Sequence, residues 1–276
     1  MTIFEAIIFG IVQGLTEFLP ISSTAHIIIA ELIFGYNFPG LAFEIFLHVA
    51  SVFAVAFYFR RDLWAVIRGF FLYFREKNQE NRVHFMFGIY IITATAITAI
   101  LGLSLKSLVV DVMKTPPFIA GALVVTGTAL IFIERFREYG SRRENKMTFL
   151  DSAIVGIGQT IAVLPGISRS GATLIAALWA GLDRDTAVRY SFLLVIPAII
   201  GSAVLSAGDI SGEIWTAIGT GPLVASFLAS FIFSLVGIIW LIDFLKRGRL
   251  IYFALYCYLV AFLVYNYVRE IPPTIY

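Results

Sequence analysis

Ionisable and hydroxyl side chains gather in two short polar breaks of an otherwise apolar sequence. The first break contains Gln13, Glu17 and His26 together with three consecutive hydroxyl residues. Gln13 and Glu17 are four residues apart, as on one face of a helix, and His26 follows Ser22 and Ser23 by four and three residues. The first break therefore offers a nucleophile, a base and an orienting acid within one small volume.

The first break also has a purely structural interpretation. One hydroxyl among Ser22, Ser23 and Thr24 is expected to cap the helix that follows. Glu17 and His26 would then form a buried ion pair that closes a helical hairpin. A carboxylate and an imidazole at membrane depth cost several kcal/mol unless they are paired, which favours a functional role.

The second break has the residue types of an anion site. A Pro-Gly pair ends one apolar segment, and a serine then begins a helix whose free N–H groups and positive dipole end favour an anion. The arginine that follows offers a guanidinium fork suited to two phosphate oxygens, although its alternative role is to neutralise Glu17. The residues expected to bind phosphate are Gly166, Ser168, Arg169, Ser170 and Thr173, with Gln13 and Ser22 from the first break. Together the two breaks predict phosphoryl transfer at the membrane surface.

The composition requires a bilayer as the solvent of this chain. Of its 276 residues 59% are hydrophobic and 14% are charged, and the mean hydropathy is +0.91. An all-α polytopic membrane protein is therefore expected, with spans long enough to cross ~30 Å of hydrocarbon. The six predicted spans are Leu41–Phe59, Phe85–Leu105, Pro117–Ile133, Val188–Ala207, Leu223–Ile242 and Leu250–Val268.

Basic residues predict the orientation of these spans. Lysine and arginine concentrate in loops 60–84, 134–149 and 243–249, which we expect on the cytoplasmic side. Loops 106–116 and 208–222 carry few or no basic residues and are expected outside, as are both termini. Topogenic charge explains the basic runs, so no nucleic-acid partner is predicted.

Two leftover segments, 1–40 and 147–187, each have to return to the side where they began. Each reads as a re-entrant hairpin, with two apolar arms too short to span singly and a polar turn between them. An offset of 146 residues aligns identical residues of the two halves, among them Gln13 with Gln159 and Ser22 with Ser168. We therefore predict one membrane domain over the whole chain, built as an inverted-topology repeat of one hairpin and three spans in each half. The repeats are expected at about 1–134 and 147–268, with the two breaks facing each other.

Three motifs in these breaks resemble the signature sequences of the undecaprenyl-diphosphate phosphatase family. They are the Gln13…Glu17 pair, residues 19–26 (LPISSTAH) and residues 165–173 (PGISRSGAT). The resemblance covers essentially the whole chain, including the order of the spans. It implies hydrolysis of the terminal phosphate of a polyprenyl diphosphate at the outer face. It also implies recycling of the carrier lipid for cell-wall glycans, resistance to bacitracin and a divalent cation, Mg²⁺ or Ca²⁺.

The resemblance also implies roles for single residues. Ser23 and His26 are similar to the family's nucleophile and base candidates, and Ser168, Arg169 and Thr173 to its diphosphate-binding residues. We expect Ser23 to attack the phosphorus, with His26 taking its proton and Glu17 orienting the imidazole or activating the later water, while His26 or a directly activated water stays open as the nucleophile. The expected catalytic residues are Glu17, Ser23, His26 and Arg169. Gln13 and Glu17 stand where the family has an acidic pair that is implied to hold the metal. Because Gln13 replaces a carboxylate, we expect the cation to arrive bridging the diphosphate. Partners expected are the lipid substrate and membrane lipids, and a homodimer is left open.

Two alternatives remain to be weighed. Inverted repeats with broken helices are also transporter architecture, so a lipid or ion transporter or flippase is the second hypothesis. The acid-phosphatase class of lipid phosphatases is excluded, because Ile175 stands where its motif requires histidine after Ser168 and Arg169. Glu44 and His48, four apart in the first span, are expected to line the entrance or to pair, outside the core set.

Overall fold

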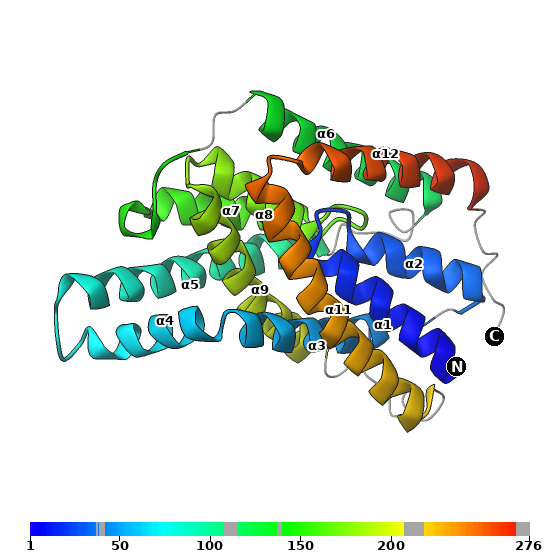
Figure 1. The fold of residues 1–276 in the computed structure, drawn as a ribbon, viewed down its shortest axis with the longest axis horizontal. Coiled ribbons are helices and arrows are strands. Elements are labelled where there is room, and N and C mark those ends of the chain that lie inside the picture. Colours follow the sequence, from blue (N-terminus) through cyan, green and yellow to red (C-terminus); the bar gives the residue numbers. More distant parts are fainter. Residues whose placement is uncertain (37, 39–41, 107–114, 137–139, 207–217, 269–276) are drawn as a thin grey trace.

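The chain folds into helices packed around the two breaks (Figure 1). The structure, a computed structural model, describes residues 1–268 except 37, 39–41, 107–114, 137–139 and 207–217. No strand occurs among the residues described, which confirms the expected all-α class. In chain order the α-helices are α1 (Ile3–Phe18), α2 (Ser23–Phe34), α3 (Ala42–Tyr58), α4 (Arg60–Leu72), α5 (Gln79–Lys106), α6 (Pro116–Phe136), α7 (Phe149–Ile161), α8 (Arg169–Trp179), α9 (Arg184–Ser206), α11 (Thr220–Lys246) and α12 (Leu250–Tyr267).

Long apolar helices confirm the polytopic membrane assignment. Within the described part of the chain, five helices are long and apolar enough to cross a bilayer: α5, α6, α9, α11 and α12. A sixth is obtained when α3 and α4 are counted as one span bent by 79°. The predicted outer loops fall largely on residues 107–114 and 208–217, outside the described residues, as does the end of the chain after Val268.

The prediction of a simple loop over 60–84 was wrong, because α4 fills its first half. α4 is amphipathic and turns sharply away from α3. Trp64 and Phe71 expose large apolar surfaces, whereas Val66 and Gly69 are buried against the rest of the protein. A helix with apolar side chains outside and basic residues at its start is typical of the membrane interface. Arg60, Arg61 and Arg68 are therefore helical, and the cytoplasmic side of this segment stays a prediction.

The two hairpins have the short arms that the sequence predicts. Helices α1 and α2 have 16 and 12 residues, and α7 and α8 have 13 and 11. At about 1.5 Å per residue, none of the four reaches ~30 Å alone. Each half of the chain thus contains one short hairpin followed by long helices.

The caps of these hairpins agree with the 146-residue offset. Thr2 forms a capping box with Glu5 at the start of α1, and Thr148 forms one with Asp151 at the start of α7. Ser22 and Ser168, at the same offset, cap α2 and α8 by accepting hydrogen bonds from the backbone N–H three residues on. The matched caps support the predicted repeat, and the inverted relation of the halves stays a prediction.

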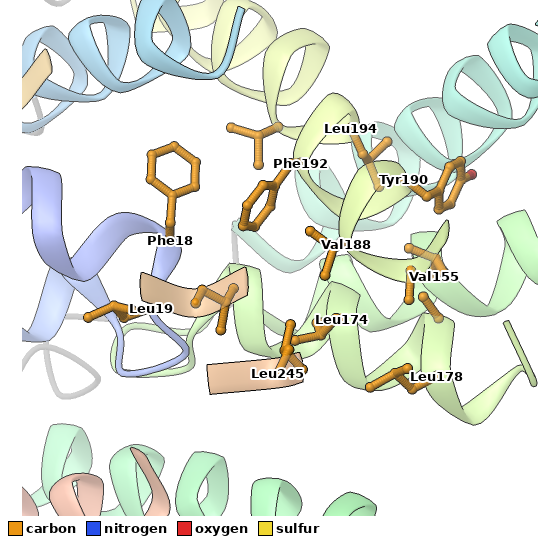
Figure 2. Packing of buried hydrophobic residues seen from close by; sticks show 14 of the residues in the cluster. Phe18, Leu19, Val155, Leu174, Leu178, Val188, Tyr190, Phe192, Leu194 and Leu245 are labelled. Atoms are coloured by element: carbon orange, nitrogen blue, oxygen red, sulfur yellow. The ribbon is translucent and has the colours of Figure 1, made fainter. Parts of the chain in front are cut away.

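Close packing against α11 fixes the position of α1 and of the polar residues that it carries. α1 lies alongside α11 in Figure 1, and glycines let their backbones approach. A Cβ added at Gly10 would lie 2.3 Å from the Ser226 carbonyl oxygen, and one at Gly14 would lie 2.6 Å from the Ser230 carbonyl oxygen. The opposite side of the hairpin turn is apolar, where Phe18 meets Phe192 of α9 in the buried cluster of Figure 2. Glu17 lies between these two contacts in the sequence and is held in place by both.

Candidate active site

The tips of the two hairpins touch, as the sequence predicts. The Ser170 hydroxyl donates a hydrogen bond to the Leu19 carbonyl oxygen at 3.2 Å. A Cβ added at Gly171 would lie 3.2 Å from the Pro20 Cβ, so the tips are in van der Waals proximity. Arg169 forms an ion pair with Glu17 across the same contact. The two breaks are therefore parts of one site.

Ser22 shapes the first break through its backbone. It is the non-glycine residue with positive φ among those described, at φ 69°. Such a conformation is strained for a side chain with a Cβ and is concentrated at functional sites. Because Ser22 supplies the cap of α2, the hydroxyls of Ser23 and Thr24 are released for other partners.

Glu17 is the centre of the site. Its side chain is almost fully buried, with a residue exposure of 4%. Its Oε2 accepts from the Gln13 amide at 2.9 Å and from the Ser23 hydroxyl at 2.8 Å. The same oxygen lies 3.1 Å from the His48 Nε2, and the other oxygen pairs with Arg169. A buried carboxylate thus holds a nucleophile candidate directly, with the His48 imidazole at one oxygen and the Arg169 guanidinium at the other.

His48 is the site residue that the sequence reasoning left out of the core set. Its Nδ1 lies 2.7 Å from the Glu44 carbonyl oxygen, which can only accept. Its Nε2 faces the Glu17 carboxylate, which also only accepts when ionised. Each ring nitrogen of His48 thus faces an oxygen acceptor. The spacing of Glu44 and His48 was visible in the sequence, but which helix face meets Glu17 was not.

Glu44 supports the first break from α3. Its carboxylate accepts a hydrogen bond from the Thr24 hydroxyl at 2.6 Å, while its carbonyl orients His48. The expected Glu44–His48 pair is thus made through the Glu44 backbone oxygen, and the carboxylate is used elsewhere. Glu44 and His48 together tie α3 to both arms of the first hairpin.

His26 has other partners than the sequence suggested. Its Nδ1 lies 2.7 Å from the Ser22 carbonyl oxygen and its Nε2 lies 2.8 Å from the Tyr256 hydroxyl. The expected ion pair of His26 with Glu17 is therefore replaced by the pairs that Glu17 makes with His48 and Arg169. The carboxylate contacts Ser23 without an intervening imidazole.

The hydroxyl groups of the second break are engaged mainly in hydrogen bonds within the protein. Ser168 caps α8, Ser170 bonds the first break, and Thr173 donates to the Arg169 and Ser170 carbonyl oxygens at 3.1 and 3.3 Å. All three are buried, whereas the Arg169 side chain keeps 22% of its surface. Gly166 has φ 91°, and an added Cβ would lie 2.7 Å from the Ala122 Cβ. Arg169 is thus the group of this break most accessible to an anion.

The residues present do not form a complete metal site of their own. Among the described residues no cluster of three or more histidine, cysteine or acidic side chains could hold a metal ion. Gln13 Oε1 is buried without a hydrogen-bond partner and is a single spare oxygen donor. Both oxygens of Glu17 already face basic side chains. Because Mg²⁺ and Ca²⁺ need several oxygen ligands, Gln13 and Glu17 alone do not fit one.

The chain is similar to proteins of one known family. A family model described as bacitracin resistance protein BacA matches residues 6–263. A protein of Halalkalibacterium halodurans named undecaprenyl-diphosphatase 2 is 63% identical over 268 residues, 97% of this chain and 96% of its own length. One of Shouchella clausii, named undecaprenyl-diphosphatase 1, is 50% identical over 96% of both chains. One of Bacillus anthracis, named undecaprenyl-diphosphatase 3, is 34% identical over 95% of this chain and 96% of its own.

Proposed function

Because the chain belongs to the bacitracin resistance protein BacA family and is an undecaprenyl-diphosphatase, we propose that the Glu17-centred cluster is where the lipid diphosphate is hydrolysed. The observation that carries this proposal is the Ser23 hydroxyl 2.8 Å from the Glu17 carboxylate, beside Arg169. A hydroxyl, a proton acceptor and a phosphate-binding cation are the parts that phosphoryl transfer requires. The enzyme is an integral membrane hydrolase that recycles the carrier lipid.

In the first step the Ser23 oxygen attacks the terminal phosphorus. A bond from Oγ to phosphorus forms, the bond from phosphorus to the bridging oxygen breaks, and the lipid monophosphate leaves. The Ser23 proton passes to Glu17, since that carboxylate already accepts its hydrogen bond. This assignment moves the base role from His26, where the motif placed it, to Glu17.

Two cations around Glu17 allow one of them to serve the substrate. Glu17 carries one negative charge, while Arg169 and, we propose, His48 carry one positive charge each. When the Arg169 guanidinium turns to the phosphoryl oxygens, His48 still neutralises Glu17. Arg169 can then stabilise the charge that develops on those oxygens.

In the second step water hydrolyses the phosphoserine. A bond from the water oxygen to phosphorus forms, the bond from Ser23 to phosphorus breaks, and Glu17 returns its proton to Ser23. His26, one turn further along α2, accepts the proton that the water gives up. The divalent cation is proposed to arrive with the diphosphate, where it would offset the charge of the phosphate oxygens.

We further propose that the site opens to the outer face of the cell membrane, with both termini outside. The arginine- and lysine-rich ends of the helices, at 60–84, 134–149 and 243–249, support this orientation. A polyprenyl chain would then lie along the apolar helices while its diphosphate reaches the two hairpin tips.

Phosphate release from a polyprenyl diphosphate by purified protein in detergent tests the proposal. Ser23→Ala should lower turnover by about 10³-fold or more, and a phosphate analogue should label Ser23 in the native enzyme only. Ser104→Ala is a matched control, because that serine is exposed and donates within its own helix. Near-native turnover in Ser23→Ala would refute the covalent step. Release without any ion gradient distinguishes the hydrolase from the transporter hypothesis.

A further inference from the structure

His26 is joined to the last helix of the protein by Tyr256. The two rings stack with an interplanar angle of 9° and a centroid distance of 5.6 Å. The Tyr256 hydroxyl lies 2.8 Å from His26 Nε2. The pair therefore connects the first hairpin to α12, which otherwise packs mainly on α6.

The neighbouring residue holds this part of α12 in place. The Cys257 thiol is buried and lies 3.7 Å from the Pro20 carbonyl oxygen at the tip of the first hairpin. On the other side, Gly127 of α6 admits the α12 backbone, since a Cβ there would lie 3.0 Å from the Ala254 carbonyl oxygen. The position of Tyr256 relative to His26 is thus fixed from two directions.

One tautomer of the neutral imidazole satisfies both hydrogen bonds of His26. Its Nδ1 faces the Ser22 carbonyl oxygen at 2.7 Å, which only accepts, so Nδ1 carries the proton. Nε2 then presents a lone pair and accepts the hydrogen bond from the Tyr256 hydroxyl. In this tautomer His26 is a neutral imidazole whose Nε2 lone pair accepts from Tyr256.

We propose that Tyr256 positions His26 as this neutral imidazole and passes the water proton to it in the phosphatase reaction. The inference rests on the proposed role of His26 in the second step. Tyr256 donates to Nε2 while the imidazole is neutral. When the water of the second step gives up its proton, the Tyr256 oxygen takes that proton as its own hydroxyl hydrogen passes to Nε2, and the oxygen then accepts from Nε2–H. The same side chain thus satisfies His26 before and after proton transfer. Tyr256 is 39% exposed, which leaves its hydroxyl room to reorient.

Replacing Tyr256 by phenylalanine tests the proposal, because the ring stays and only the hydroxyl is lost. We expect kcat for phosphate release to fall about tenfold with KM within about twofold of native. Tyr258→Phe is the matched control. Tyr258 lies on the same helix and its hydroxyl bonds Thr128 of α6 at 2.9 Å, away from the site. It should keep native kcat.

Nitrogen NMR of ¹⁵N-histidine-labelled protein gives a readout that a merely structural role would not move. The chain has three histidines, so His26 can be assigned with single variants of the other two. Native protein should show a protonated Nδ1 and an unprotonated Nε2 at His26. Tyr256→Phe should show exchange between both tautomers, whereas Tyr258→Phe should match the native spectrum.

The outcomes separate this inference from the proposed function. If His26→Gln slows turnover but Tyr256→Phe keeps native kcat and a native His26 spectrum, the positioning role is refuted and the proposed function stands. If His26→Gln turns over at the native rate, the second-step role of His26 fails, and the positioning role fails with it. A slow Tyr256→Phe enzyme with mixed tautomers supports both.

Discussion

Glu17→Gln is the substitution that most directly tests the arrangement around Ser23. Glutamine keeps the shape of the side chain but puts an NH₂ group in place of one oxygen, and it carries no charge. At the Oε2 position an amide nitrogen cannot accept from Ser23 at 2.8 Å or from His48 at 3.1 Å. The nucleophile therefore loses its proton acceptor, and Arg169 loses its partner anion.

The expected loss of activity follows from the role of a general base. Such a group contributes about 10²- to 10⁴-fold, which is about 3–5 kcal/mol in the barrier. Stability should fall as well, since Arg169 and His48 are left as two cations facing a neutral amide. Breaking one partner of a buried pair costs about 3 kcal/mol, and we expect Tm in detergent to fall by roughly 5–10 °C.

The assay is phosphate release in detergent alongside thermal unfolding of the same samples. Glu5→Gln is the control on the same helix, because Glu5 bonds Thr2 and Tyr36 at the other end of α1. It should keep native turnover. Turnover of Glu17→Gln within tenfold of native would refute Glu17 as the proton acceptor, and a fall in Tm without that loss would leave it a structural role only.

Three further predictions concern the surroundings of the site. His48→Gln keeps a donor to the carboxylate but removes the charge, so kcat/KM for phosphate release should fall about tenfold; an unchanged value would contradict the imidazolium. Gly166→Ala adds a Cβ at φ 91° and 2.7 Å from the Ala122 Cβ, and should cost about 1–3 kcal/mol by thermal unfolding; a native Tm would show that this turn relaxes. Burial raises the pKa of Asp151, but its hydrogen bonds, chiefly from Arg142, outweigh burial and hold that pKa below the usual range. The stabilisation from this pair is thus present above the ordinary aspartate pKa of about 4 and lost as pH falls below it, and Arg142→Ala should remove that acid dependence of Tm.

The sequence predicted most of the scaffold because its signals are local. The length of the apolar segments predicted the spans, and the run of hydroxyl residues predicted a cap, which Ser22 supplies. The cytoplasmic side of the basic loops stays a prediction. The sequence also predicted that the two breaks face each other, and the ion pair between Arg169 and Glu17 confirms that prediction. The alternative that these two residues neutralise each other fits the same geometry, because they form an ion pair.

What the sequence could not provide is the rotation of one helix against another. His48 is separated from Glu17 in the sequence by the whole of α2 and the residues before α3, and the two meet because α3 packs against α1. Tyr256 is one of several tyrosines in an apolar helix, and its pairing with His26 spans 230 residues of sequence. Helical spacing places such residues on a face, but tertiary packing decides what the face contacts.

The caps at matched positions explain how a duplicated scaffold makes an unsymmetrical site. Ser23 and Arg169 are separated by the 146-residue offset, and each is the first residue of a helix that a serine caps. Both contact the same carboxylate, Glu17, whose counterpart in the second half is Val163. The N-termini of α2 and α8, which favour an anion, therefore both lie at Glu17. The first carries the Ser23 hydroxyl and the second carries the Arg169 guanidinium. A second carboxylate at position 163 would compete for Arg169, so the loss of symmetry at this position is what frees a cation for the phosphate.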